Sequence, residues 1–147
     1  MNTSIATLLA GKGRALHTVP TSVTVTEAVQ KMNQHKIGAV LVLNGEQLAG
    51  IFTERDVLTR VIAASLDPKT TPITKVMSGN VLTVAPEVTV QEVMDIFADR
   101  RCRHLPVIEH DKLMGLISIG DVSRWVANSH RAEAESLRQY IAGAIST

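Results

Sequence analysis

The sequence predicts an α+β fold made of two copies of one β-α-β-β-α unit packed sheet to sheet. Residues 18–61 align with residues 83–126 without a gap, at an offset of 65, and twelve of the 44 aligned positions are identical. Each copy carries a helix-start signature followed by two β-branched apolar runs. A unit of about 45 residues buries too little surface to fold alone, so we expect the two sheets to share a core.

The first helix of each copy is predicted from its start signal and its apolar spacing. Thr24 with Glu27, and Thr89 with Glu92, have the S/T-x-x-E spacing of a capping box. Apolar side chains then recur at helical spacing. They are Val25, Ala28, Val29 and Met32 in the first copy and Val90, Val93, Met94 and Phe97 in the second.

Two strands and a second helix follow in each copy. The predicted strands are Ile37–Leu43 and Leu48–Phe52 around an Asn44-Gly45 turn, and Cys102–Ile108 and Leu113–Ser118 around a His110-Asp111 turn. The second helices carry Val57, Leu58, Val61 and Ile62, or Val122, Trp125 and Val126. Thr18 and Thr83 begin the short first strands.

These elements predict four segments. Residues 1–66 form the first unit with an N-terminal helix at Thr3–Ala10, and 67–72 form a linker rich in Pro and Thr. Residues 73–128 form the second unit, which begins with a short helix at Ile73–Met77. Residues 129–147 form a C-terminal amphipathic helix, with Leu137, Tyr140, Ile141 and Ala144 on one face. This helix either caps the chain's own core or contacts a second copy.

Composition excludes several classes of partner. Fifteen basic and fourteen acidic residues give a net charge of +1, and only four residues are aromatic, so we expect neither nucleic acid nor a membrane surface as partner. The single cysteine excludes an intrachain disulfide. No apolar run approaches the ~20 residues of a membrane helix, and the apolar run Ile5–Ala10 is too short for a secretory signal. We therefore expect a cytoplasmic, soluble protein.

The candidate chemistry lies at two strand-to-helix junctions. Gly50 to Asp56 and Gly115 to Asp121 both read Gly-apolar-apolar-Thr/Ser-x-x-Asp. One interpretation is structural, because T-x-x-D and S-x-x-D can cap a helix. The other is a ligand site. A helix N-terminus favours phosphate, and a carboxylate with a hydroxyl can hold the vicinal hydroxyls of a sugar.

The duplicated pattern resembles a pair of CBS (cystathionine β-synthase) domains, known together as a Bateman module. The resemblance rests on the two junctions, on Thr18-Val19-Pro20, on Val76-Met77 leading into Val81–Val84, and on Arg103–Val107. It implies pseudo-twofold pairing of the units, frequent dimerisation and a regulatory, non-enzymatic role. It also implies an adenosine ligand in the cleft between the units: AMP first, with NAD(H), ATP or ADP as alternatives. Small stand-alone bacterial members that bind AMP or NAD(H) are the most similar.

The resemblance also assigns residues to two crossed sites. Asp56 and Asp121 would hold ribose, with Thr53 and Ser118 beside them and Ile51 and Leu116 from the same junctions. Arg103 and His104 would face phosphate at the Asp121 site, and Thr18, Ile37 and Gly38 would line its base pocket. Thr83, Cys102 and Arg103 would serve the Asp56 site. The first copy has Gly38-Ala39 where the second has Arg103-His104, so the two sites should differ in phosphate affinity.

Other reactive residues receive simpler interpretations. Cys102 is expected in the core rather than as a reactive thiol. Arg100 and Arg101 are read as a solvated helix end, with an RNA-binding patch as the alternative. The five histidines have no metal-ligand spacing, and no catalytic or phosphate-loop motif is present. Three hypotheses stay open: a nucleotide-sensing module, a ligand-free interaction or dimerisation module, and a nucleotide hydrolase.

Overall fold

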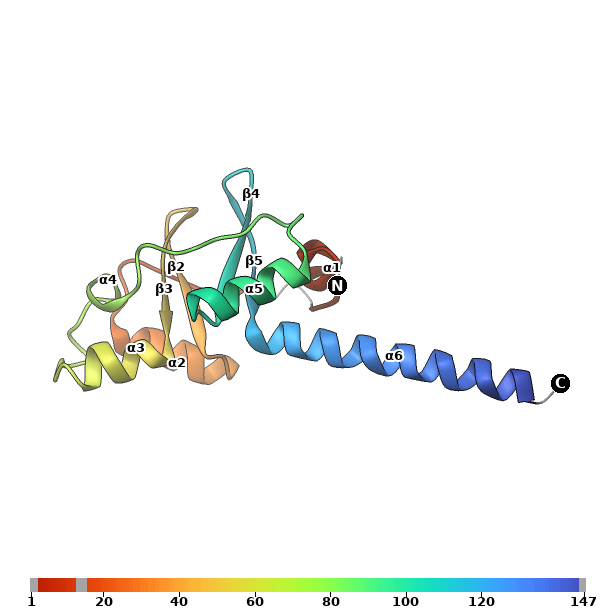
Figure 1. Ribbon diagram of the computed structural model, residues 1–147. Helices are drawn as coiled ribbons and strands as arrows, with labels where there is room; N and C mark the ends of the chain where they lie inside the picture. The colour runs from red at the N-terminus through yellow and green to blue at the C-terminus, as the bar shows by residue number, and fades with distance from the viewer. Residues whose placement is uncertain (1–2, 13–15, 146–147) are drawn as a thin grey trace. The chain divides into compact units, whose positions relative to one another are not determined.

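The computed structural model has the mixed helix and strand content that the sequence predicts (Figure 1). It describes the backbone of residues 3–12 and 16–145 and the side chains up to Gly143. The strands are β1 (Thr18–Pro20), β2 (Ala39–Asn44), β3 (Gln47–Thr53), β4 (His104–Glu109) and β5 (Lys112–Ser118). The helices are α1 (Ile5–Lys12), α2 (Val25–His35), α3 (Glu54–Asp56), the π-helix η1 (Val57–Ile62), α4 (Ile73–Val76), α5 (Val90–Arg100) and α6 (Ile119–Ile145).

The chain divides into two compact units that do not coincide with the two sequence copies. The first, here the strand unit, consists of Arg14–Pro86 and Leu105–Leu116. The second, here the helix unit, consists of Met1–Gly13, Glu87–His104 and Ile117–Thr147. The division of the sequence at residues 66, 72 and 128 stays a prediction.

Backbone pairing in the strand unit repeats with the sequence. β1 runs parallel to β2, with Val19 opposite Val42, and β2 is antiparallel to β3. In the second copy, Val84 forms a parallel bridge with Val107, at positions 65 residues after Val19 and Val42. β4 and β5 form a two-stranded sheet. The internal repeat therefore extends to strand register.

The core of the strand unit uses both faces of β2. Val40 and Val42 pack in one cluster with Val25 of α2, Phe52 and Val61 of η1. The opposite face presents Ala39 and Leu41, which join Ile51 and contact Leu113 and Leu116 from β5. This strand alternation explains the continuous apolar run in the sequence, since both faces are covered. Within this unit, the expected packing of sheet against sheet is confirmed.

The two first helices have related starts and equivalent ends. Thr24 Oγ1 accepts the Glu27 N–H at 3.3 Å, and Thr89 and Glu92 form a complete capping box with both bonds at 3.2 Å. Each helix ends on a left-handed residue, Lys36 with φ 53° and Arg101 with φ 52°. Such caps satisfy carbonyls that the last helical turn leaves free.

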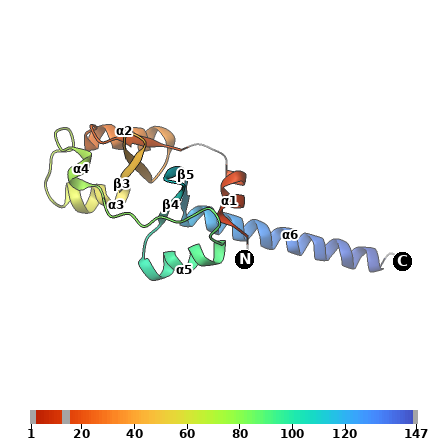
Figure 2. The ribbon, with the colours of Figure 1, turned by 90° about the horizontal axis from the view of Figure 1, so that it is seen from above.

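The second helices differ from the expectation and from each other. After α3, the backbone of the first copy continues as a π-helix, in which the Ala63 N–H donates to Leu58 O at 2.9 Å. Leu58 and Ile62, expected on the apolar face, are exposed. In the second copy, the second helix and the C-terminal helix are one continuous helix, α6 (Figure 2), since no Gly or Pro interrupts residues 121–142.

The distal half of α6 packs on no core among the described residues. Every described side chain from His130 to Gly143 is exposed, including Leu137, Tyr140 and Ile141. The side chain of Ala144 and residues 146–147 lie outside the described part of the chain.

In each copy, backbone hydrogen bonds join the start of the first helix to a short segment from elsewhere in the chain. Thr71 O and Val23 O accept the N–H groups of Val25 and Ile73, both at 3.0 Å, which joins the start of α4 to the start of α2. In the helix unit, Ile5 N donates to Val88 O and Val90 N to Thr3 O, both at 2.8 Å. Helix α1, which the sequence grouped with the first copy, thus pairs with the start of α5. The predicted linker takes part in the first of these pairings through Thr71.

One glycine is required by the close approach of two segments. Ile51 in β3 and Ser78 exchange backbone hydrogen bonds of 3.0 and 2.9 Å. A Cβ on the neighbouring Gly50 would lie 2.7 Å from both Met77 Sδ and Ser78 O. The segment after α4 therefore needs a residue without a side chain at position 50.

We expect Gly50→Ala to destabilise the protein by about 1–3 kcal/mol, because the backbone at Ser78 must shift to admit the methyl group. Urea unfolding of the variant and the wild type measures this difference. Gly11→Ala, where an added Cβ meets nothing within 4 Å, is the matched control and should be neutral or stabilising, since alanine favours helix. Equal stability of Gly50→Ala and the wild type would contradict the close approach.

Candidate functional site

The first candidate junction, at the end of β3, is a complete capping box. Asp56 Oδ2 accepts the Thr53 N–H at 2.9 Å and the Thr53 hydroxyl at 3.2 Å. Thr53 Oγ1 in turn accepts the Asp56 N–H at 3.3 Å. These bonds satisfy donors at the start of α3 and hold the carboxylate, which is only 8% exposed.

The second junction, at the end of β5, repeats this arrangement. Asp121 Oδ2 accepts the Ser118 N–H at 2.8 Å, and Ser118 Oγ accepts the Asp121 N–H at 3.1 Å. Asp121 is 6% exposed. The structural interpretation of both motifs as helix caps is therefore confirmed, and it does not conflict with a ligand role for the same carboxylates.

Each junction lies beside the segment that enters the first strand of its hairpin. Glu54 N donates to Gly38 O at 3.0 Å, and Ile119 N donates to Arg103 O at 2.9 Å. These two bonds are equivalent at the repeat offset of 65. The structure thus brings Gly38 to the Thr53–Asp56 box and Arg103 to the Ser118–Asp121 box.

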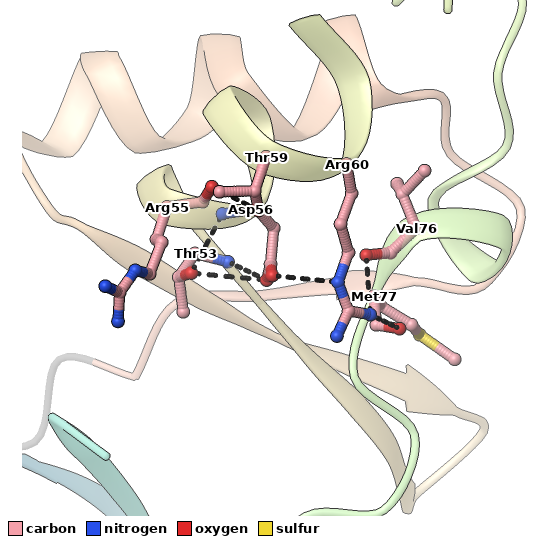
Figure 3. Close-up of polar contacts among 7 residues, drawn as sticks. All are labelled: Thr53, Arg55, Asp56, Thr59, Arg60, Val76 and Met77. Atoms are coloured by element: carbon pink, nitrogen blue, oxygen red, sulfur yellow. Dashed lines mark hydrogen bonds and ion pairs between the residues drawn. The ribbon is translucent and has the colours of Figure 1, made fainter. Parts of the chain in front are cut away.

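Arg60 links the Asp56 carboxylate to the end of α4 (Figure 3). Its Nε lies 3.5 Å from Asp56 Oδ1. Its Nη1 donates to the carbonyls of Met77 and Val76 at 3.1 and 3.4 Å. These carbonyls lie at the C-terminal end of α4, where a cation is stabilised. Arg55, by contrast, points away from the carboxylate in Figure 3.

Asp121 is surrounded more closely by cations. Lys12 Nζ lies 2.6 Å from its Oδ2 and Arg124 Nη2 lies 2.6 Å from its Oδ1. Figures 1 and 2 show α1, which carries Lys12, beside the start of α6. Burial raises the pKa of Asp121. The hydrogen bond and charge of Lys12 and the hydrogen bonds from Ser118 lower it by more, so the pKa of Asp121 lies below its ordinary value.

The remaining predicted residues are distributed over the two units. Thr18, Ile37, Gly38, Ile51, Thr83 and Leu116 lie in the strand unit with Thr53 and Asp56, whereas Cys102, Arg103 and His104 lie in the helix unit with Ser118 and Asp121. The backbone carbonyl of Thr18 accepts a hydrogen bond from Lys31. The side chains of Ile51 and Leu116 belong to the apolar cluster around Leu41. Thr83 and Arg103 are exposed.

Sequence reasoning missed three cations that contact the two aspartates. Arg60 and Arg124 follow Asp56 and Asp121 by four and three residues, a spacing at which helical side chains meet, so this signal was available. Lys12 is 109 residues from Asp121 and gave no signal.

Cys102 is not a core strand residue. It precedes β4, is only half-buried and has no disulfide partner. Desolvation raises the pKa of its thiol, which keeps the thiol protonated and unreactive near neutral pH.

The described residues also bear on metal binding and on membrane insertion. No group of three or more His, Cys, Asp or Glu side chains there could hold a metal ion. Among the same residues, no helix is both long and apolar enough to cross a membrane.

Comparison with known proteins defines the class. The profile of the CBS domain matches residues 13–63 and again residues 73–128. The mitochondrial CBS domain-containing protein CBSX3 of Arabidopsis thaliana is 39% identical over 151 residues, which cover 97% of this chain and 73% of the relative. A solved protein with CBS domains from Burkholderia ambifaria has a TM-score of 0.81 at 38% identity, covering 84% of this chain and 93% of that one.

A CBS domain protein from Pyrobaculum aerophilum, solved in complex with AMP, has a TM-score of 0.72 over 80% of this chain and 88% of its own. At 23% identity this likeness concerns the fold. The chain belongs to the CBS domain family and carries the domain in tandem. Tandem CBS proteins are regulatory modules.

The lowered pKa of Asp121 predicts a stability change in acid. The pKa of Asp121 is lower in the folded than in the unfolded chain, so in acid the unfolded chain binds more protons than the folded chain does. The ionised carboxylate therefore contributes its full stabilisation above the unfolded pKa of about 3.9. This contribution is lost as the pH falls through the folded pKa. We expect the free energy of unfolding, measured with urea between about pH 3 and 6, to depend less steeply on pH in Asp121→Asn than in the wild type. The difference in slope should correspond to at most about one proton. Asp99→Asn, on an exposed part of α5, is the control. An unchanged slope in Asp121→Asn would contradict the ion pairs.

Proposed function

We propose that this chain is a regulatory module that binds an adenine nucleotide at its two Thr/Ser-x-x-Asp junctions. The observation that carries this proposal is the pair of buried carboxylates, Asp56 and Asp121, each of which accepts the backbone N–H of the last strand residue at a strand-to-helix junction. A carboxylate accepts only, which suits a ribose that presents two neighbouring hydroxyl donors. The start of a helix beside it favours the ligand's phosphate.

The polar surroundings support a phosphorylated ligand at the Asp121 junction. Arg103 adjoins it through the bond from Ile119, and Arg124 reaches its carboxylate. The equivalent position of Arg103 in the first copy is Gly38, which adjoins Glu54. We infer that phosphate is bound more tightly where Arg103 and His104 take part, since arginine makes bidentate contacts with phosphate.

AMP is the first candidate ligand, with NAD(H), ATP and ADP as alternatives. The complex of the Pyrobaculum relative with AMP supports adenine nucleotide binding by this fold. In this proposal, Thr18, Ile37, Gly38, Thr83 and Cys102 line the base pockets and the nucleotide lies between the CBS domains. The bound ligand then shifts the equilibrium between conformations by its differential affinity for them. The protein that receives this signal is a further partner of unidentified class.

A second candidate, a ligand-free interaction module, is favoured by the capping boxes themselves. Thr53 with Asp56 and Ser118 with Asp121 satisfy one another's polar groups. The positions of both aspartates therefore have a structural explanation without a ligand. The two candidates differ in what loss of a carboxylate does to ligand binding.

We expect AMP to raise the unfolding temperature of the protein. At an AMP concentration of 100 times the dissociation constant, each occupied site should add about 2.7 kcal/mol to the free energy of unfolding. Asp56→Ala and Asp121→Ala should each remove the contribution of one site. Both should also lose about 1 kcal/mol from the broken cap. NAD, NADH, ATP, ADP and S-adenosylmethionine are compared in the same assay.

Glu92→Ala is the matched control, because it breaks the capping box of α5 at an exposed residue outside the proposed site. It should lose similar stability and keep the full AMP shift. If nucleotide-free protein shows no shift with any of the ligands, the interaction module is the better account. An AMP shift that both aspartate variants retain would place the ligand elsewhere.

We further propose that the protein is a homodimer joined through α6. Leu137, Tyr140 and Ile141 follow helical i, i+3, i+4 spacing and are 59%, 76% and 48% exposed. A stripe of this kind is stabilised when a second helix covers it. A second copy supplies the same stripe.

The double variant Leu137→Glu and Tyr140→Glu should shift the protein to monomer in light scattering after size-exclusion chromatography. Its thermal stability at high dilution should stay unchanged, because the substituted side chains are exposed. Gln139→Glu on the same exposed helix segment adds charge outside the stripe and should leave the dimer intact. A dimer that persists in the double variant would exclude this interface.

A further inference from the structure

The two aspartates differ in what already occupies their carboxylate oxygens. An ionised carboxylate offers about four acceptor sites, two on each oxygen. On Asp121, Oδ2 accepts both the Ser118 N–H at 2.8 Å and Lys12 Nζ at 2.6 Å, while Oδ1 accepts Arg124 Nη2 at 2.6 Å. Oδ2 therefore has both of its acceptor sites filled by charged or backbone donors.

The equivalent carboxylate in the first copy is more available. Asp56 Oδ2 accepts the N–H and the hydroxyl of Thr53, and a neutral hydroxyl can rotate to another acceptor. Arg60 Nε lies 3.5 Å from Asp56 Oδ1, which is farther than the 2.6 Å between Arg124 and Asp121. Arg60 also donates to the carbonyls at the end of α4. Within the described residues, no lysine from a preceding helix contacts this carboxylate.

We propose that Lys12 is a latch on the Asp121 carboxylate, so that a ribose binds there only by displacing the end of α1. This inference rests on the proposed function. A cis-diol donates two hydrogen bonds and needs one acceptor site on each oxygen. Oδ1 has one left, but Oδ2 gains one only when Lys12 leaves.

Displacement of Lys12 has a structural consequence for α1. Its N-terminal end is fixed by the backbone bonds of Thr3 and Ile5 to the segment before α5, and by the buried side chains of Ile5 and Leu8. At its C-terminal end, Lys12 joins α1 to the start of α6 through its bond to Asp121. Ligand binding at Asp121 therefore loosens the last turn of α1, just before the chain enters the strand unit in sequence.

Arg124 does not act as a second latch. It lies on the same helix as Asp121, three residues on, and its side chain is 71% exposed. It can follow the ligand's phosphate without moving another element. Lys12 is the cation whose displacement joins ligand binding to a different helix.

Adenosine is the probe that separates two possible effects of Lys12 on a nucleotide: competition with the ribose for Asp121 and attraction of the phosphate. It carries the ribose diol but no phosphate, so Lys12 can oppose its binding but has no anion to attract. In an Asp56→Ala background, which leaves only the Asp121 site, Lys12→Met should bind adenosine about fivefold more tightly, the factor a partly exposed ion pair supplies. Methionine keeps most of the apolar stem of lysine. Isothermal titration calorimetry measures the affinities.

Two controls and a second readout complete the test. Lys75→Met, on the exposed side of α4, the helix equivalent to α1, should leave adenosine affinity unchanged. With 2′-deoxyadenosine, which lacks one donor, the gain in Lys12→Met should fall. In the Asp56→Ala protein that keeps Lys12, saturating adenosine should speed amide hydrogen exchange at residues 9–12 and leave the amides of α5 unaffected.

The outcomes separate this inference from the function on which it rests. Equal or weaker adenosine binding by Lys12→Met, with AMP still bound by the parent, overturns the latch and leaves nucleotide binding intact. Unchanged exchange at residues 9–12 on saturation also overturns it. If neither adenosine nor AMP binds to the parent or to Lys12→Met, nucleotide binding at Asp121 fails and the latch fails with it.

Discussion

The carboxylate that closes each strand-to-helix junction is the interaction on which the rest of the structure depends. Asp56 and Asp121 fix the direction in which the chain leaves β3 and β5, because each holds the backbone N–H of the residue that ends the strand. The same turn brings the segment before β2 or β4 into backbone contact with the new helix. Strand, turn, helix and the neighbouring entry segment are therefore set by one buried acid in each copy. Its charge is balanced by Arg60, or by Lys12 and Arg124.

Each copy of the repeat needs a segment from outside the copy to pair with the start of its first helix. The segment that starts α4 pairs with the start of α2, and the segment that starts α1 pairs with the start of α5. Helix α1 precedes the first copy but belongs to the helix unit together with α5 and α6. This exchange makes a single copy marginal on its own, since a short segment that buries residues such as Ile5 or Ile73 comes from elsewhere in the chain. It also places Lys12, at the end of α1, against the Asp121 carboxylate.

Local signals were sufficient to predict most of the fold and both capping junctions. Capping residues such as Thr89, the turn at His110-Asp111 and the apolar alternation of β2 act over a few residues, so they are readable in sequence order. What the sequence did not reveal depends on contacts between distant segments. The salt bridge from Lys12 to Asp121, the pairing of Ile51 with Ser78 and the constraint on Gly50 each join parts of the chain that carry no mutual pattern. The π-helix after Asp56 was missed because its apolar residues have ordinary helical spacing.

The two aspartates differ from the acids of the other capping boxes in this chain. The chain has four boxes of this spacing, and in two of them the acid is glutamate, Glu27 or Glu92, exposed to solvent. A cap needs no more than that, because its task is to accept backbone N–H groups. At the other two boxes the acid is aspartate and less than a tenth exposed, and burying an ionised group costs stability unless it is paired. The chain holds cations against both buried acids, which offsets a cost that an exposed glutamate would have avoided. A charge placed in this way, twice and in equivalent positions, supports the proposal that each aspartate receives a ligand as well as capping a helix.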